Sequence, residues 1–135
     1  MSNFFIVCSP TGNPISESLP SFKEWVANRF PGAEVSEDQR YETRAVTWDW
    51  TSEGSTRWIA GSIDRDRKSI SMKGDLDVVC ETAISSMKLF PPSVDVVIAN
   101  DSQGLVFDLR RVADARQLAD ALTNGNDGLE WRETG

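Results

Sequence analysis

The fold of this chain is decided by residues 41–73, which read YETRAVTWDWTSEGSTRWIAGSIDRDRKSISMK. Apolar and polar side chains alternate in three segments of this stretch, namely 41–50, 56–64 and 69–73. A period of two is typical of strands that bury one face. Residues 52–55 and 65–68 separate the segments, and both connections are short enough to close a hairpin. The stretch therefore predicts a three-stranded antiparallel meander.

The register of this meander follows if each loop closes symmetrically. Trp48 then lies opposite Ile59 on the core face, while Asp49 lies opposite Trp58 on the other face. A slip of one residue would place apolar side chains opposite polar ones throughout. Trp50 shares the face of Trp48 and is expected to be half covered, because it is near the end of the hairpin. Trp58 is therefore a large aromatic ring predicted on the polar face.

The segments before and after the meander contain one strand and two helices. Residues 3–8 form a short apolar run, which suits a strand buried on both faces. Ser21 and Glu24 form a capping box that predicts the start of a helix ended by Pro31. Asp75 follows as the N-cap of a second helix, whose apolar residues fall on one stripe.

The last third of the chain predicts a hairpin and a helix. Residues 94–100 pair with 105–110, which places Asp95 opposite Arg110, and a helix follows over 113–123. The predicted order is β-α-β-β-β-α-β-β-α. This order is typical of one α+β domain over residues 1–135, a mostly antiparallel sheet with helices on one face. Residues 124–135 are expected to be a loosely packed tail.

Composition excludes several classes of function. The 135 residues include 21 Asp and Glu against 14 Lys and Arg, for a net charge of −7, and no histidine. An acidic chain is a poor nucleic-acid binder, because the phosphate backbone requires a basic face. Without histidine there is no Ser-His-Asp triad and no His-ligated zinc. The apolar runs are too short for a signal peptide or a membrane helix, so we expect a cytoplasmic protein.

Two carboxylate pairs and two cysteines are the candidates for chemistry. The pair Asp64 and Asp66 falls in a turn with arginines, and the pair Asp75 and Asp77 opens a helix, so both have ordinary structural uses. Neither cysteine has a residue that would activate its thiolate, and both fall at apolar positions. We therefore expect no catalytic residue, no metal and no cofactor, and a protein that is not an enzyme.

The tryptophans and nearby acidic residues are the candidates for binding a partner. Aromatic rings inside a polar rim are the usual anchors of protein interfaces. The residues proposed here for such a surface are Trp58, Asp49, Glu53, Asp64, Asp66 and Trp50. The alternative is that a terminal segment around Trp131 covers Trp58 within the chain.

With its length, acidity, α+β pattern and acidic aromatic surface, the chain resembles the small acidic immunity proteins of bacterial polymorphic toxin systems (contact-dependent or type VI). This resemblance implies a toxin inhibitor that is a monomer when free. It would capture a basic toxin domain and block the active site of the toxin, either directly or from a neighbouring surface. The order from the first helix onward is also similar to acidic type III secretion chaperones, which implies instead a dimer that binds an effector segment.

Overall fold

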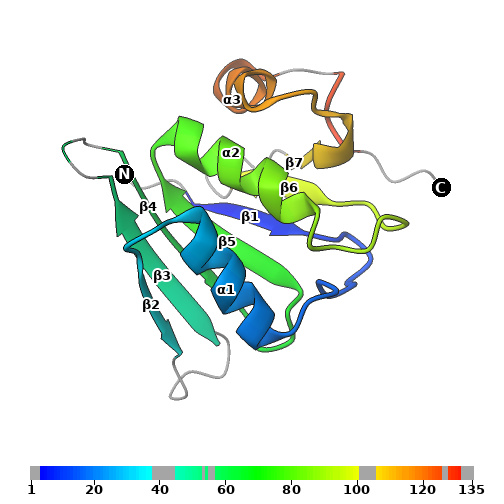
Figure 1. Ribbon diagram of the computed structural model, residues 1–135. Helices are drawn as coiled ribbons and strands as arrows, with labels where there is room; N and C mark the ends of the chain where they lie inside the picture. The colour runs from blue at the N-terminus through cyan, green and yellow to red at the C-terminus, as the bar shows by residue number, and fades with distance from the viewer. Residues whose placement is uncertain are drawn as a thin grey trace.

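The structure is a computed structural model, and it contains one antiparallel sheet with helices packed on one side (Figure 1). The seven strands follow the order β2-β3-β4-β5-β1-β6-β7, and every neighbouring pair is antiparallel. The structure describes residues 4–37, 45–52, 54, 57–100, 106–125 and 128–131. The predicted α+β class is confirmed.

The elements follow one another along the chain with short connections. The strands are β1 (Phe5–Cys8), β2 (Glu34–Glu37), β3 (Val46–Thr51), β4 (Trp58–Ile63), β5 (Ser69–Gly74), β6 (Val97–Asn100) and β7 (Val106–Asp108). The helices are α1 (Leu19–Arg29), α2 (Leu76–Met87), the 3-10 helix η1 (Leu109–Arg111) and α3 (Ala115–Asn124). Within the described residues, none of these helices is long and apolar enough to cross a membrane.

β2 is absent from the predicted order. Its four residues, EVSE, contain a single apolar side chain, so alternation gives no signal there. Val35 nevertheless lies opposite Trp48, and the partly buried Val35 packs against the core. The meander therefore has four strands, β2 to β5, and β2 forms one edge of the sheet.

β1 lies in the middle of the sheet, between β5 and β6. Phe5 and Val7 are buried in the core, whereas Ile6 and Cys8 on the other side are only half-buried. The expectation that this strand is buried on both faces is therefore wrong. Helices cover just one side of the sheet, which is common for antiparallel sheets.

The register of β3 and β4 differs by two residues from the prediction. Trp48 lies opposite Gly61, and Asp49 lies opposite Ala60. The hairpin closes where the Ser52 N–H donates to the Arg57 carbonyl, so the connecting loop begins one residue later than predicted. A Cβ at position 61 would overlap the indole of Trp48, so glycine makes room for the ring there. Because the shift is even, each side chain keeps its predicted face.

Of the three predicted helices, α2 begins after Asp75 as expected, whereas α1 and α3 begin at different residues from those predicted. Ser18 caps α1 by accepting a hydrogen bond from the Ser21 N–H, so the helix starts three residues before the expected capping box. Asp114 caps α3 in the same way, through the Gln117 N–H at 2.8 Å. Pro20 is tolerated in the first turn of α1, because the N–H groups there have no partner within the helix.

α2 is buried more widely than its predicted apolar stripe, because it lies between the sheet and α3 (Figure 1). Thr82 and Ser86 are fully buried and donate their hydroxyl protons to carbonyls of their own helix. Burial, together with the nearby charges of Asp77 and Glu81, raises the pKa of the Cys80 thiol to about 12. Both cysteines are free thiols.

The end of the chain also departs from expectation. Within the predicted loose tail, residues 128–131 lie along β7, where Leu129 is buried. The Leu129 carbonyl accepts from the Asp108 N–H, and the Trp131 N–H donates to the Val106 carbonyl. The expected pair of Asp95 and Arg110 is replaced, because the Arg110 guanidinium donates to the carbonyls of Val94 and Pro91.

The contact between Trp48 and Gly61 gives a test of the register. We expect Gly61→Ala to lower the free energy of unfolding by about 1–3 kcal/mol, because the added methyl group forces the indole out of place. Ala60→Ser, one residue away on the other face, is the control and should change stability by less than about 0.5 kcal/mol. Urea denaturation measures both, and equal stabilities of the two variants would contradict the observed packing.

Candidate functional site

The side of the sheet that faces away from α1 and α2 is the candidate site, and it is called the outer face below. The outward side chains of β3, β4 and β5 are half-buried or exposed, whereas their inward side chains are buried, apart from the half-buried Trp50. In the part of the chain that the structure describes, no helix lies on this side (Figure 1). Among the described residues, the outer face is therefore formed by the side chains of the strands themselves.

Two of the proposed site residues lie together on the outer face. Trp58 is 37% exposed, and Asp49 is exposed on the neighbouring strand. They are diagonal neighbours rather than opposite one another, because Trp58 lies opposite Thr51. The segment around Trp131 does not cover Trp58, since it pairs with β7, four strands away from β4.

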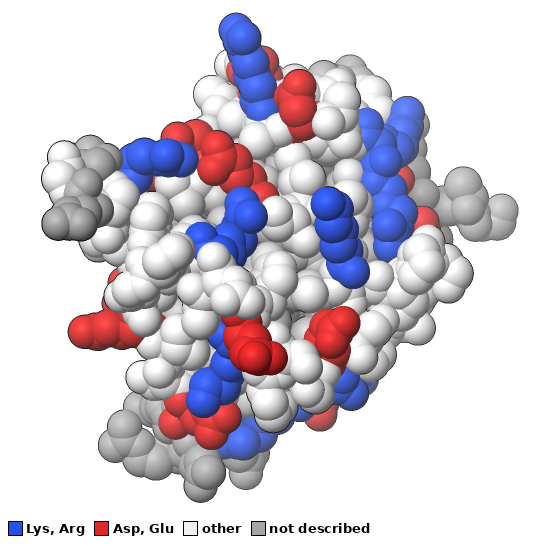
Figure 2. Space-filling view, viewed as in Figure 1, with Lys and Arg blue, Asp and Glu red and all other residues white. Residues whose placement is uncertain are grey.

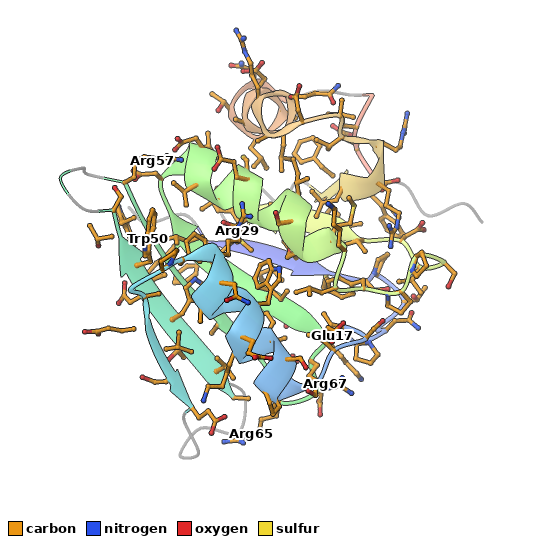
Figure 3. All side chains as sticks on the ribbon, viewed as in Figure 1. Glu17, Arg29, Trp50, Arg57, Arg65 and Arg67 are labelled. Atoms are coloured by element: carbon orange, nitrogen blue, oxygen red, sulfur yellow. The ribbon has the colours of Figure 1, made fainter. Side chains whose placement is uncertain are left out.

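Trp50 lies on the opposite side of the sheet, as its alternation with Asp49 requires. Its ring is half-buried and packs on Phe30, with the ring centroids 5.1 Å apart. Figure 3 shows Trp50 on the helix side, near the end of α1. Trp50 is therefore not part of the same surface as Trp58.

Asp64 and Asp66 lie in the turn after β4, at the far end of that strand from Trp58. Six residues of extended strand separate Asp64 from Trp58 by about 20 Å. One Asp64 carboxylate oxygen accepts from the N–H groups of Lys68 and Ser69, at 2.7 and 3.2 Å, so this side chain stabilises the turn. Asp66 is exposed in the same turn, and Glu53 lies outside the described residues.

The same turn is tied to the loop before α1 by Arg67. Its guanidinium donates to the carbonyls of Ile15 and Glu17, at 3.2 and 2.7 Å (Figure 3). The Ile15 N–H donates in return to the Arg67 carbonyl. Arg67 adopts a φ of 60°, which is uncommon for a residue other than glycine. These contacts give the turn a structural role.

Asp75 holds the backbone of Trp58 in place. A carboxylate oxygen of Asp75 accepts from the Trp58 N–H at 2.7 Å, and the Asp75 N–H donates to the Trp58 carbonyl at 3.1 Å. Asp75 makes no side-chain hydrogen bond to the helix that it precedes. Its carboxylate therefore fixes the strand that carries the exposed indole.

Sequence reasoning missed Phe4. This ring is 36% exposed and lies next to Lys73, whose Nζ atom is 5.2 Å from the ring centroid. The run of apolar residues at 4–7 favoured a strand buried on both faces, so an exposed side chain was not expected at position 4. The unusual signal was the pair Phe4-Phe5, since adjacent residues in a strand point to opposite faces.

A hollow of about 390 Å³ lies on the outer face across β2, β3, β4 and β5, with Phe4 and Lys73 on one side. Its middle row consists of small hydroxyl side chains that lie opposite one another on successive strands, namely Ser36, Thr47, Ser62 and Ser71. Ala60 continues the floor beside this row. The hollow exists because these side chains are shorter than those around them.

Charged side chains lie on both sides of the sheet. Figure 2 shows the helix side, where Lys and Arg side chains are interspersed among Asp and Glu. There Arg57 lies 3.2 Å from Asp77 and 3.5 Å from Glu81. On the outer face, Glu34 and Asp49 border the hollow, and neither forms an ion pair with a residue in the described ranges.

The two carboxylate pairs that the sequence suggested do not converge. Asp64 accepts a hydrogen bond from a backbone N–H of its own turn, and Asp75 accepts one from the Trp58 N–H. Asp77 forms an ion pair with Arg57. Among the described residues, no group of three Asp, Glu, Cys or His side chains is placed to hold a metal ion.

The contact between Asp75 and Trp58 can be tested by hydrogen exchange. We expect Asp75→Ala to speed exchange of the Trp58 amide and to lower the free energy of unfolding by about 1 kcal/mol, because that N–H loses its acceptor. Asp75→Asn keeps an acceptor oxygen and serves as the control. Equal exchange rates in the wild-type protein and in Asp75→Ala would show that the carboxylate does not hold the strand.

Comparisons of this chain with protein-family models, with curated proteins and with solved structures found no match.

Proposed function

We propose that this chain is a binding protein that captures a basic protein domain on the outer face of its sheet. In this proposal it acts as an immunity protein, which neutralises a cognate bacterial toxin by covering the toxin's active site or a surface beside it. The proposal concerns binding alone and requires no catalytic group of this chain.

One observation carries the proposal. Phe4 and Trp58 are the large apolar side chains that the described residues leave exposed, and both lie on the outer face. Single exposed apolar residues are ordinary, but two exposed rings on the same face of a sheet, with polar neighbours, resemble the centre of a protein interface. Trp is also enriched among the residues that contribute most to binding.

Charge supports a basic partner. The chain carries a net charge of −7, and the carboxylates of Glu34 and Asp49 on the outer face have no partner among the described residues. Lys73 is a cation on the same face, and it lies over the ring of Phe4. Complementary charge speeds the encounter of two proteins and excludes partners of the same sign. An inhibitor that must act before its toxin does benefits directly from a fast encounter.

The proposal can be tested with the protein domain encoded by the adjacent reading frame. We expect this domain to arrest growth when expressed alone and growth to recover when this chain is expressed with it. Calorimetry should then give a complex whose affinity falls at least about tenfold from low to high salt, as charge steering requires. Light scattering should find the free chain monomeric; a stable dimer, or an affinity independent of salt, would contradict the proposal.

Trp58 provides the matching mutational test. We expect Trp58→Ala to weaken that complex by about 2 kcal/mol, or about thirtyfold, because a large ring is lost from the centre of the interface. Stability should change little, since the ring is exposed. Trp50→Phe alters a tryptophan on the opposite side of the sheet and should leave affinity unchanged. If both variants bind like the wild-type protein, the outer face is not the binding surface.

A further inference from the structure

We propose that the hollow on the outer face is a receptor for one arginine side chain of the partner. This inference rests on the proposed function and assigns the chemistry that the outer face would recognise. It follows from three features of the hollow: two facing carboxylates, a row of hydroxyl groups, and a floor of short side chains.

The facing carboxylates are Glu34 and Asp49. They lie directly opposite one another on β2 and β3, and both are exposed at the border of the hollow. Side chains in such a pair have Cβ atoms about 4.5–5.5 Å apart, and like charges at this position destabilise a sheet. No cation from the described residues pairs with either of them. A bound cation would remove this repulsion, so the pair favours a positively charged occupant.

The hydroxyl groups favour guanidinium over ammonium. Next to the facing carboxylates, Ser36 and Thr47 form the following cross-strand pair, and Ser62 lies opposite Thr47. A guanidinium carries five N–H donors in a planar fork, whereas an ammonium is a compact point charge. Two carboxylates with hydroxyl oxygens beside them offer acceptors over a wide area, which matches the fork better.

The short side chains at the floor of the hollow leave room for the arginine side chain of the partner. Ala60 lies opposite Asp49 on one side and opposite Lys73 on the other, so no long side chain fills the space between those two charges. The hollow, at about 390 Å³, is within the range of pockets that hold small organic groups. Its lining is more polar than that of most small-molecule sites, which favours a charged side chain from a protein.

Lys73 is not the cation that neutralises the facing carboxylates of Glu34 and Asp49. It lies two strands from Asp49, about 9–10 Å across the sheet, and its ammonium is 5.2 Å from the centre of the Phe4 ring. A partner arginine bound at the carboxylates would therefore experience only a weak, screened repulsion from Lys73. Removal of the Asp49 charge and removal of the Lys73 charge should therefore have different effects on binding of a cationic ligand, and this difference provides the test.

The experiment titrates the full isotope-labelled chain with N-acetyl-arginine methylamide and follows backbone amides by NMR. We expect saturable shifts centred on Asp49, Ala60 and Ser62. The citrulline compound has nearly the same shape without the charge and should cause no such shifts. The lysine compound should bind more weakly than the arginine compound, because it lacks the planar fork.

Two variants decide which charge is responsible. Asp49→Asn should weaken binding of the arginine compound about fivefold, the upper range for an exposed ion pair. Lys73→Met should leave binding unchanged or strengthen it. Asp120→Asn, in α3 on the helix side, is the control and should have no effect.

The remaining outcomes overturn the proposal. Equal shifts with the citrulline compound, equal affinity for the lysine compound, or loss of binding in Lys73→Met would each exclude an arginine receptor. Shifts centred away from the hollow would do the same. A protein partner whose complex still depends on Trp58, together with no response to the arginine compound, would leave the proposed function intact and refute this inference alone.

Discussion

The packing of the Trp48 indole against Gly61 is the contact on which the outer face depends. It favours the observed register of β3 and β4, because a Cβ at position 61 would overlap the ring. That register places Asp49 opposite Ala60 and Thr47 opposite Ser62, so short side chains line up across the strands. In the register two residues away, Trp58 would stand opposite Asp49 and fill the space. A contact in the core therefore shapes the surface on the other side of the sheet.

The outer face combines features that each have a modest effect alone. An exposed ring on a flexible strand would lose conformational entropy if it bound a partner. Asp75, at the start of α2, already fixes the backbone of Trp58 and would reduce that loss. The facing carboxylates of Glu34 and Asp49 would be only a small defect in the sheet if a cation lay beside them, yet none of the described residues supplies one. Natural proteins keep such local conflicts mainly where function requires them. The facing carboxylates therefore favour the proposal that the outer face binds a partner over the alternative that it is simply exposed to solvent.

Much of this arrangement was predictable from the sequence, and the limits have physical causes. Alternation of apolar and polar residues predicts the face of each side chain, and Trp58, Asp49 and Trp50 all lie on the predicted faces. It cannot predict register, because a shift of two residues preserves every face. β2 was missed because its single apolar residue gives no pattern, and Glu34 was missed with it. Phe4 was missed because a short apolar run looks the same whether one or both of its faces are buried.

The central position of β1 has a consequence for how the chain folds. Phe5 pairs with Met72 and Asn100, so both partners of this strand are synthesised long after it. The meander β2 to β5 joins neighbours in sequence and can form early, whereas β1 can pair with β5 only once that strand has been synthesised, and gains its second partner only with β6. β5 has an unpaired edge until β1 pairs with it, and β1 has one until β6 forms; such edges are places where unfinished chains can associate. We therefore expect completion of the sheet, which joins strands far apart in sequence, to be slower than formation of the meander.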